Sequence, residues 1–221
     1  MKSKRTQKIA QLSGAARGRS GRRLPRQQRA QLTLGAIMDA AVKILKKNGV
    51  AAVNTNRIAE VAGVSIGSVY QYFPDKRAIF IALHKRHVED IDRRMERVLL
   101  EHAASPLKAL IVALVDTMVE AHTADPELYE LLFTEVPHRA GGTQDFPARL
   151  HRALRLAIAS RVRELGASGN LDLMAFVVAH MVDALTHGAV LRRPAGVSLE
   201  GAKDEAVRAI LAYVQAGGRP N

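Results

Sequence analysis

Residues 54–76 place the strongest constraint on the fold, because they predict two short helices joined by a tight turn. The Asn-Thr pair that opens this stretch offers side-chain oxygens that accept hydrogen bonds from the first N–H groups of a helix. Gly63 follows the last periodic apolar position, where glycine readily adopts the left-handed conformation that ends a helix. Ser65 can cap a second helix, and Pro74 ends it because the residue before a proline is displaced from the α region. The stretch therefore predicts a helix-turn-helix.

The second helix of this pair carries side chains that suit a DNA surface. It is too short to be stable alone in water, so packing must hold it, and Val69 and Phe73 can supply the inward face. A recognition helix enters the major groove with its N-terminal residues at the base edges, where small and hydrogen-bonding side chains are favourable. The residues left exposed at this end are Ile66, Gly67, Ser68, Tyr70 and Gln71. The alternative is a helical hairpin that only packs against the rest of the protein.

Residues 57–76, RIAEVAGVSIGSVYQYFPDK, closely resemble the signature of TetR-type transcriptional regulators. Residues 37–49 look like the first helix of that family, and the clear resemblance covers roughly residues 28–83. The chain departs from the family at Leu45, where Phe is frequent, and at Ile66, where many members carry a polar or basic residue. Ile66 could instead contact a thymine methyl group.

The resemblance implies an all-α fold with a three-helix helix-turn-helix domain, followed by a C-terminal helical domain for ligand binding and dimerisation. It also implies a homodimeric repressor that binds a palindromic DNA operator and is released by a small-molecule effector. The positions carried over as DNA contacts are Thr55, Ser65, Ile66, Gly67, Ser68, Tyr70, Gln71, Tyr72 and Lys76. Thr55 and Lys76 would hold phosphates, and Gly67, Ser68 and Tyr70 would lie nearest the bases. Tyr72 could instead belong to the core.

Positive charge is concentrated at the N-terminus. The net charge is +12, residues 1–29 hold ten Lys or Arg and no acidic residue, and residues 77–221 hold eighteen of each sign. Residues 1–26 carry few large apolar side chains, so we expect a basic, disordered arm. Such an arm either contacts DNA, with a gain from counterion release, or only keeps the protein soluble. The expected organisation is this arm, a DNA-binding domain over residues 27–76 and a regulatory domain over residues 77–221.

Apolar periodicity predicts helices along the whole remaining chain and no strand. Ser105-Pro106 and Asp125-Pro126 each combine a capping residue with a proline suited to the first helical position. A loop is expected at residues 137–147 and a break at residues 166–170. The predicted helices cover about residues 28–47, 75–102, 148–165, 171–191 and 199–215, with two more that start at the proline signals.

The helix predicted at residues 171–191 is apolar nearly all round, which is typical of a helix buried on several sides. Its small residues Ala175, Ala179, Ala184 and Gly188 would permit close approach by another helix. We expect one side to pack inward and the other to contact a second subunit. TetR-type proteins usually dimerise through their last two long helices, and the alternative is a central core helix in a monomer.

The regulatory domain carries large apolar and aromatic residues that, as sequence alone, are typical of an ordinary core. In the TetR family a cavity among the equivalent helices usually binds a small effector. By that resemblance, the candidate lining residues are Met118, Tyr129, Phe133, Phe146, Met174, Phe176 and Met181.

No catalytic centre is apparent, since the chain has neither a glycine-rich phosphate loop nor a Gly-x-Ser-x-Gly elbow. His84 and His87, or His180, Asp183 and His187, could bind a divalent metal, but neither spacing matches a full motif. The chain has no cysteine, which excludes disulfides and thiolate metal sites. We therefore expect no enzymatic activity, no metal and no cofactor.

The sequence has no evident secretory signal, and its longest uncharged apolar run is well short of the roughly 18 residues that suggest a membrane span. We expect a cytoplasmic protein with no membrane partner. Two other classes stay open: a basic protein that coats DNA without regard to sequence, and an α-helical enzyme or metal protein that uses the histidines.

Overall fold

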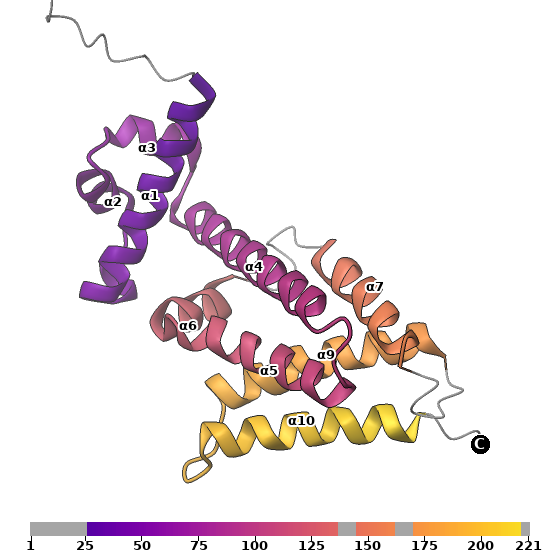
Figure 1. Ribbon diagram of the computed structural model, residues 1–221. Coiled ribbons are helices and arrows are strands. Elements are labelled where there is room, and N and C mark those ends of the chain that lie inside the picture. The colour runs from indigo at the N-terminus through magenta and orange to yellow at the C-terminus, as the bar shows by residue number, and fades with distance from the viewer. Residues whose placement is uncertain (1–25, 137–144, 162–169, 218–221) are drawn as a thin grey trace, which may run out of the picture. The chain divides into compact units, whose positions relative to one another are not determined.

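The computed structural model describes residues 26–136, 145–161 and 170–217, and all regular structure within these ranges is helical (Figure 1). This confirms the predicted all-α fold. The chain divides into two compact units, Met1–Gly35 and Ala36–Asn221, and every buried core residue described below belongs to the second unit. The helices are α1 (Arg26–Asn48), the short 3-10 turn η1 (Val50–Ala52), α2 (Thr55–Ala62), α3 (Ile66–Tyr72), α4 (Lys76–Glu101), α5 (Leu107–Thr123), α6 (Pro126–Glu135), α7 (Asp145–Ala159), α9 (Leu171–Leu191) and α10 (Leu199–Ala216).

The helix-turn-helix is defined by local capping. The side chain of Asn54 accepts a hydrogen bond from the backbone N–H of Arg57 at 3.0 Å, which starts α2. Gly63 ends α2 with a φ of 67°, a left-handed conformation that side chains other than glycine rarely adopt. The hydroxyl of Ser65 then accepts from the backbone N–H of Ser68 at 3.0 Å and starts α3. These three signals confirm the predicted pair of helices.

Apolar side chains from the first four helices hold this domain together. Val69 on α3 is fully buried and Phe73 nearly so, as predicted for the inward face of the second helix. Two polar contacts add to the apolar core: Arg86 on α4 donates to Asp39 on α1 at 2.7 Å, and Arg57 donates to Asn48 at 2.7 Å. The buried apolar residues of this region are Ile37, Ala40, Ala41, Ile44, Leu45, Val53, Ile58, Ala59, Val69, Phe73, Ile79, Phe80 and Leu83.

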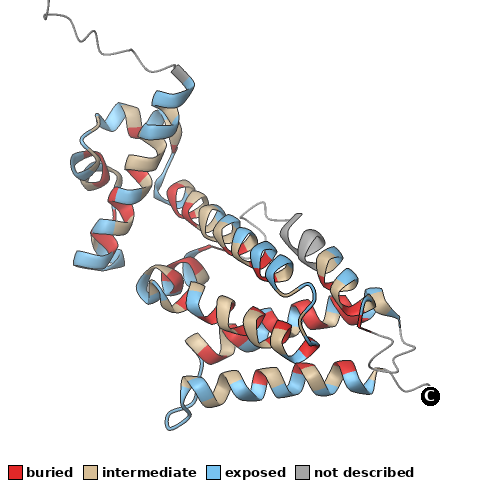
Figure 2. Ribbon diagram, in the orientation of Figure 1, coloured by how far each residue is buried: buried red, intermediate tan, exposed pale blue. Residues whose placement is uncertain are grey.

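A second core lies among the end of α4 and helices α5, α7, α9 and α10. Helices α9 and α10 lie side by side, and α5 packs against both (Figure 1). The facing sides of these helices are buried and their outer sides exposed (Figure 2). The core is built from branched aliphatic and methionine side chains, among them Met95, Leu110, Ile111, Leu114, Met118, Leu154, Ile158, Met174, Val178, Val182 and Ile210.

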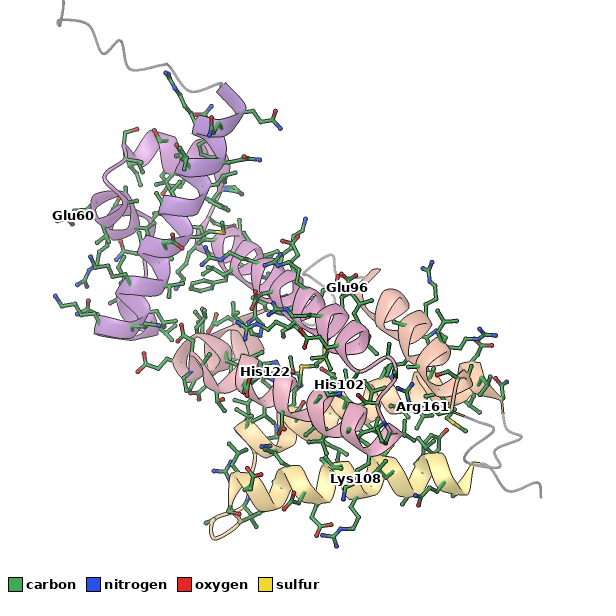
Figure 3. The ribbon with its side chains drawn as sticks, viewed as in Figure 1. Glu60, Glu96, His102, Lys108, His122 and Arg161 are labelled. Carbon is green, nitrogen blue, oxygen red and sulfur yellow. The ribbon has the colours of Figure 1, made fainter. Side chains whose placement is uncertain are left out.

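Arg161 fastens the chain just after α7 to the connection between α4 and α5. Its guanidinium donates to the carbonyl oxygens of His102 at 2.7 Å, Ala103 at 3.0 Å and Ser105 at 2.7 Å. Figure 3 shows Arg161 beside His102 at this turn, and only 4% of Arg161 is exposed. The guanidinium thus supplies charged donors to the carbonyl groups of the turn that follows α4.

Several helix limits differ from the sequence prediction. Helix α7 begins at Asp145, inside the loop predicted at residues 137–147, because Pro147 is tolerated in a first helical turn. It ends at Ala159, six residues before the predicted end. The N-cap of α5 is Pro106, and the side chain of Ser105 makes no capping hydrogen bond. Residues 1–25, 137–144 and 162–169, which include most of the predicted arm, loop and break, lie outside the described residues.

Helix α9 has the bounds predicted for it, Leu171–Leu191. Of the described helices, it alone is long and apolar enough to cross a membrane by length and composition. A core helix of a globular protein meets the same criterion, and α9 packs against α5, α7 and α10. This packing accounts for the apolar residues on the buried side of α9.

Candidate functional sites

The predicted DNA-contacting residues lie on α2, on α3 and at the start of α4, and none of them is fully buried. Thr55, Ser68 and Tyr72 are half-buried. The remaining six are exposed: Ser65, Ile66, Gly67, Tyr70, Gln71 and Lys76. The first turns of α3 therefore present a mixed surface of one glycine, one aliphatic group, one amide and several hydroxyls.

Thr55 and Tyr70 come together across the helix-turn-helix. Their hydroxyl oxygens lie 3.2 Å apart, which connects the first residue of α2 to the exposed side of α3. Tyr70 remains 53% exposed. The residue expected to hold a phosphate and the residue expected near the bases are thus adjacent on one surface.

Ser65 has a structural role that competes with any contact to DNA. Its hydroxyl oxygen accepts from the backbone N–H of Ser68 and lies 2.8 Å from the Ser68 hydroxyl. The hydroxyl is therefore already engaged as the N-cap of α3.

Gly67 faces open space. A Cβ atom added there would meet only the hydroxyl oxygen of Ser65, at 3.8 Å, which is an ordinary van der Waals contact. Among the described residues, no neighbouring helix therefore requires glycine at this position. The absence of a side chain instead leaves the backbone of α3 accessible from outside.

Lys76 opens α4 and is exposed, with its ammonium nitrogen 5.6 Å from the ring centroid of Phe80. The preceding residue, Asp75, caps α4 by accepting from the backbone N–H of Ala78 at 2.8 Å. Tyr72, at the other end of this connection, is half-buried in the last turn of α3.

The predicted effector-lining residues do not gather in one described cavity. Met118 and Met174 belong to the second core, and Met181 packs against it. Tyr129 is buried with its ring centroid 6.5 Å from that of Phe133. Phe176 points outward, 51% exposed and 4.1 Å from the ring of His180. The side chain of Phe146 lies outside the described residues.

A described groove lies elsewhere, between α4 and α7, with a volume of about 250 Å³. None of the predicted lining residues contributes to it. The residues that line it are Asp92, Met95, Glu96, Leu99, Arg152, Ala153 and Leu156.

Four rings from four helices form a group, which we call the imidazole cluster: the buried His122 on α5 and Tyr129 on α6, and the half-buried His87 on α4 and His187 on α9. The rings of His122 and Tyr129 are stacked, with centroids 4.0 Å apart. His122 lies 5.4 Å from His87 and 4.8 Å from His187. His122 is 1% exposed and Tyr129 4% exposed (Figure 3 labels His122).

The histidines of the cluster differ in the direction in which their pKa values are shifted. Burial, and next the charge of His84, lowers the pKa of His87 to about 4. Burial, and next the charge of His187, lowers the pKa of His122 to about 3. Burial also lowers the pKa of His187, but the hydrogen bond and charge of Asp183 outweigh this effect and raise it. At neutral pH, His87 and His122 are therefore uncharged.

Three buried polar atoms of the cluster have no hydrogen-bond partner among the described residues: His87 Nε2, His122 Nδ1 and Tyr129 Oη. Burial, followed by the charge of Asp183, raises the pKa of Tyr129, so its hydroxyl remains protonated. Sequence reasoning missed His122, although a signal was present. His122 lies four residues after Met118 and seven after Val115, on the apolar stripe of α5.

Two of the histidines weighed as metal ligands make other contacts within α9. The ring of His180 hydrogen-bonds to the carbonyl oxygen of Phe176 at 2.8 Å, and His187 pairs with Asp183 at 3.2 Å. In the part of the chain that the structure describes, no group of three or more His, Cys, Asp or Glu residues is arranged to hold a metal ion.

Comparison with known proteins gives two family matches. Residues 37–83 match the family described as "Bacterial regulatory proteins, tetR family", and residues 106–213 match "Tetracyclin repressor-like, C-terminal domain". The probable HTH-type transcriptional regulator ArpR of Pseudomonas putida is 30% identical over 194 residues, which cover 79% of this chain and 87% of that protein. The fatty acid metabolism regulator protein of Bacillus subtilis is 37% identical over 76 residues, which cover 34% of this chain and only 39% of that protein.

Solved structures share the fold at low sequence identity. A putative transcriptional regulator from Pseudomonas aeruginosa has a TM-score of 0.60 and 21% identity, covering 88% of this chain and 94% of that one. FadR from Bacillus subtilis, in complex with stearoyl-CoA, has a TM-score of 0.60 and 19% identity, covering 81% and 98%. SmeT, in complex with triclosan, has a TM-score of 0.58 and 21% identity, covering 81% and 90%.

Proposed function

Because the chain belongs to the TetR family of bacterial transcriptional regulators, we propose that it is a repressor that binds a palindromic operator as a homodimer. In this proposal residues 27–76 read DNA in the cytoplasm and residues 77–221 bind a small effector that releases it. The observation that carries the DNA-binding half is the exposed start of α3. There Ile66, Gly67 and Tyr70 face outward while Val69 is fully buried.

The outer side of α9 supports a second subunit. Leu173 is 56% exposed and Phe176 51%, although the opposite side of the same helix lies in the core. Burying a large apolar side chain stabilises an assembly by about 1.5–3 kcal/mol. A partner helix on this side would cover Leu173 and Phe176, and two copies of the chain would then present two α3 helices to one operator.

The effector half of the proposal is supported by the two ligand complexes among the structural relatives. FadR of Bacillus subtilis and SmeT, which share this fold, are described in complex with stearoyl-CoA and with triclosan. We propose that an effector of this chain binds among helices α4 to α9.

The basic N-terminal segment favours a second candidate, a protein that coats DNA without regard to sequence. Ten Lys or Arg and no acidic residue within residues 1–29 would bind phosphates on any duplex. The two candidates differ in the ratio of affinities for selected and random DNA.

Selection of bound sequences from a random DNA pool tests the proposal. We expect an inverted repeat whose half-sites lie about one helical turn, or a multiple of it, apart. Light scattering of the free protein at micromolar concentration is expected to give the mass of a dimer. If the selection recovers no preferred sequence and random DNA binds as tightly as any clone, the coating protein is favoured. A monomer that binds a single half-site at full affinity would contradict the proposed homodimer.

A further inference from the structure

The imidazole cluster holds a concentration of unpaired buried polar atoms. His87 Nε2, His122 Nδ1 and Tyr129 Oη come from three different helices and have no partner among the described residues. A buried polar group without a hydrogen bond lowers stability, and native proteins keep few of them. Three such atoms on rings whose centroids lie 4.0 to 5.8 Å apart indicate a place where an incoming group receives hydrogen bonds.

The hydrogen-bonding capacity of these atoms suits an oxygen that both donates and accepts. A neutral imidazole presents one donor and one acceptor, and a protonated phenol does both through its oxygen. A hydroxyl group could therefore donate to a ring nitrogen and accept from Tyr129. A metal ion is a weaker match, since no group of three ligating side chains within the described ranges is arranged to hold one.

The surroundings of the cluster disfavour a charged ligand. The burial that keeps His87 and His122 uncharged would also penalise any ion brought into the same space. An anion would in addition meet the charge of Asp183, which pairs with His187. An uncharged molecule avoids both costs.

Flat aromatic and imidazole rings make up the cluster and its nearest neighbour, Phe133. The rings of His122 and Tyr129 are stacked at 18°, and Phe133 lies 5.6 Å from the ring of His187. Such faces pack well against another planar ring. We propose that the cluster is the recognition site for an uncharged aromatic effector, which it binds through a hydroxyl group hydrogen-bonded to His87, His122 and Tyr129. This inference rests on the proposed function, since it names the chemical class of the effector.

Calorimetric titration of the full chain with three matched compounds tests the class. We expect 4-ethylphenol to bind roughly tenfold more tightly than ethylbenzene, which lacks the hydroxyl, and than 4-ethylbenzoate, which is charged. Tyr129→Phe and His122→Phe should each weaken 4-ethylphenol binding by roughly tenfold while leaving ethylbenzene binding unchanged. Tyr213→Phe, a half-buried tyrosine on α10, is the matched control and should bind all three compounds as the parent does.

Stability of the unliganded protein gives a second, independent measurement. Because the hydroxyl of Tyr129 has no partner among the described residues, Tyr129→Phe should melt at the same temperature as the parent or above it. A lower melting temperature would mean that this hydroxyl is bonded within the protein and would overturn the proposal. Three other results would also overturn the proposal: 4-ethylphenol does not bind, the three compounds bind with equal affinity, or Zn²⁺ raises the melting temperature and 4-ethylphenol does not.

Operator titration separates this inference from the proposed function. If 4-ethylphenol binds in a Tyr129-dependent manner but leaves operator affinity unchanged, the proposed binding site is supported and the proposed release of DNA by this effector is contradicted. If another compound releases the operator equally from the parent and from Tyr129→Phe, the regulator stands and the assigned site fails.

Discussion

At the scale of single residues, Gly67 offers the clearest separation of DNA binding from folding. Its missing side chain faces open space, with only the Ser65 hydroxyl 3.8 Å from an added Cβ. Gly67→Ala should therefore leave stability unchanged or raise it by up to about 1 kcal/mol, since alanine is the better helix former. Operator affinity should fall, and Gly67→Val should lower it further. Urea unfolding and operator titration on the same samples measure both effects.

A matched control for this glycine exists in α1, where a Cβ added to Gly35 would meet no atom within 4 Å. Gly35→Ala should resemble Gly67→Ala in unfolding and resemble the parent in operator binding. Loss of stability in Gly67→Ala, with DNA binding kept by the folded fraction, would mean that Gly67 packs inward.

The same scale gives a prediction for pH. His87 and His122 have pKa values near 4 and 3 in the folded protein, below the 6.5 of the unfolded chain. Between pH 6.5 and about 4 the unfolded chain binds more protons, so stability falls as pH falls, by up to about 1.4 kcal/mol per pH unit for each histidine. The groups that face them are His84, Asp90 and Arg94 on α4 and the His187–Asp183 pair on α9.

His187 acts in the opposite direction, because its raised pKa contributes stability that is present at low pH and lost as pH rises through that value. Urea unfolding of the parent and of His122→Phe at several pH values isolates the contribution of His122 to the pH dependence of stability, since the exposed carboxylates titrate equally in both proteins. The parent should lose stability more steeply between pH 6.5 and 4. Parallel curves would show that His122 is not held uncharged in the folded state.

At the scale of helices, Arg161 connects elements that are far apart in sequence. Its guanidinium donates to carbonyl oxygens 56 to 59 residues away, at the turn between α4 and α5. Arg161→Ala should destabilise the protein by about 2–3 kcal/mol, because several hydrogen bonds from a charged donor to part-buried carbonyl oxygens are lost. Arg155→Ala is the control, since Arg155 makes an exposed ion pair with Asp172 that contributes at most about 1 kcal/mol. Equal losses in the two variants would contradict the role assigned to Arg161.

At the scale of the whole molecule, the uneven distribution of charge predicts how the protein responds to salt. Deleting residues 1–26 removes nine Lys or Arg but no part of α2 or α3. Binding should weaken for all sequences, the dependence on salt concentration should become shallower, and the preferred site should not change. Binding curves at several salt concentrations measure the slope. An unchanged slope would show that the segment does not contact DNA, and a changed preferred sequence would show that it reads bases.

The amino-acid sequence by itself determined the helical elements wherever the signals are local. Asn54, Gly63 and Ser65 act within four residues of themselves, so the limits of α2 and α3 could be predicted from residue type alone. Likewise, the apolar content of α9 and the breaks that flank it were sufficient to predict where this helix begins and ends. The nine predicted DNA contacts come from a motif contained in one short stretch, and none of them is fully buried.

Only the tertiary structure decided which side chains from distant helices meet. The first and last members of the imidazole cluster, His87 and His187, are 100 positions apart in the sequence. Helical periodicity indicates the face of a helix on which each member lies, but not which face of another helix it contacts. The same reason explains why Phe176, predicted with the effector-lining residues, faces outward, and why Arg161 finds its partners at the α4–α5 turn. Helix formation depends on neighbours three or four residues away, whereas a buried cluster depends on how whole helices pack, and that packing is set by the volumes of the core side chains together.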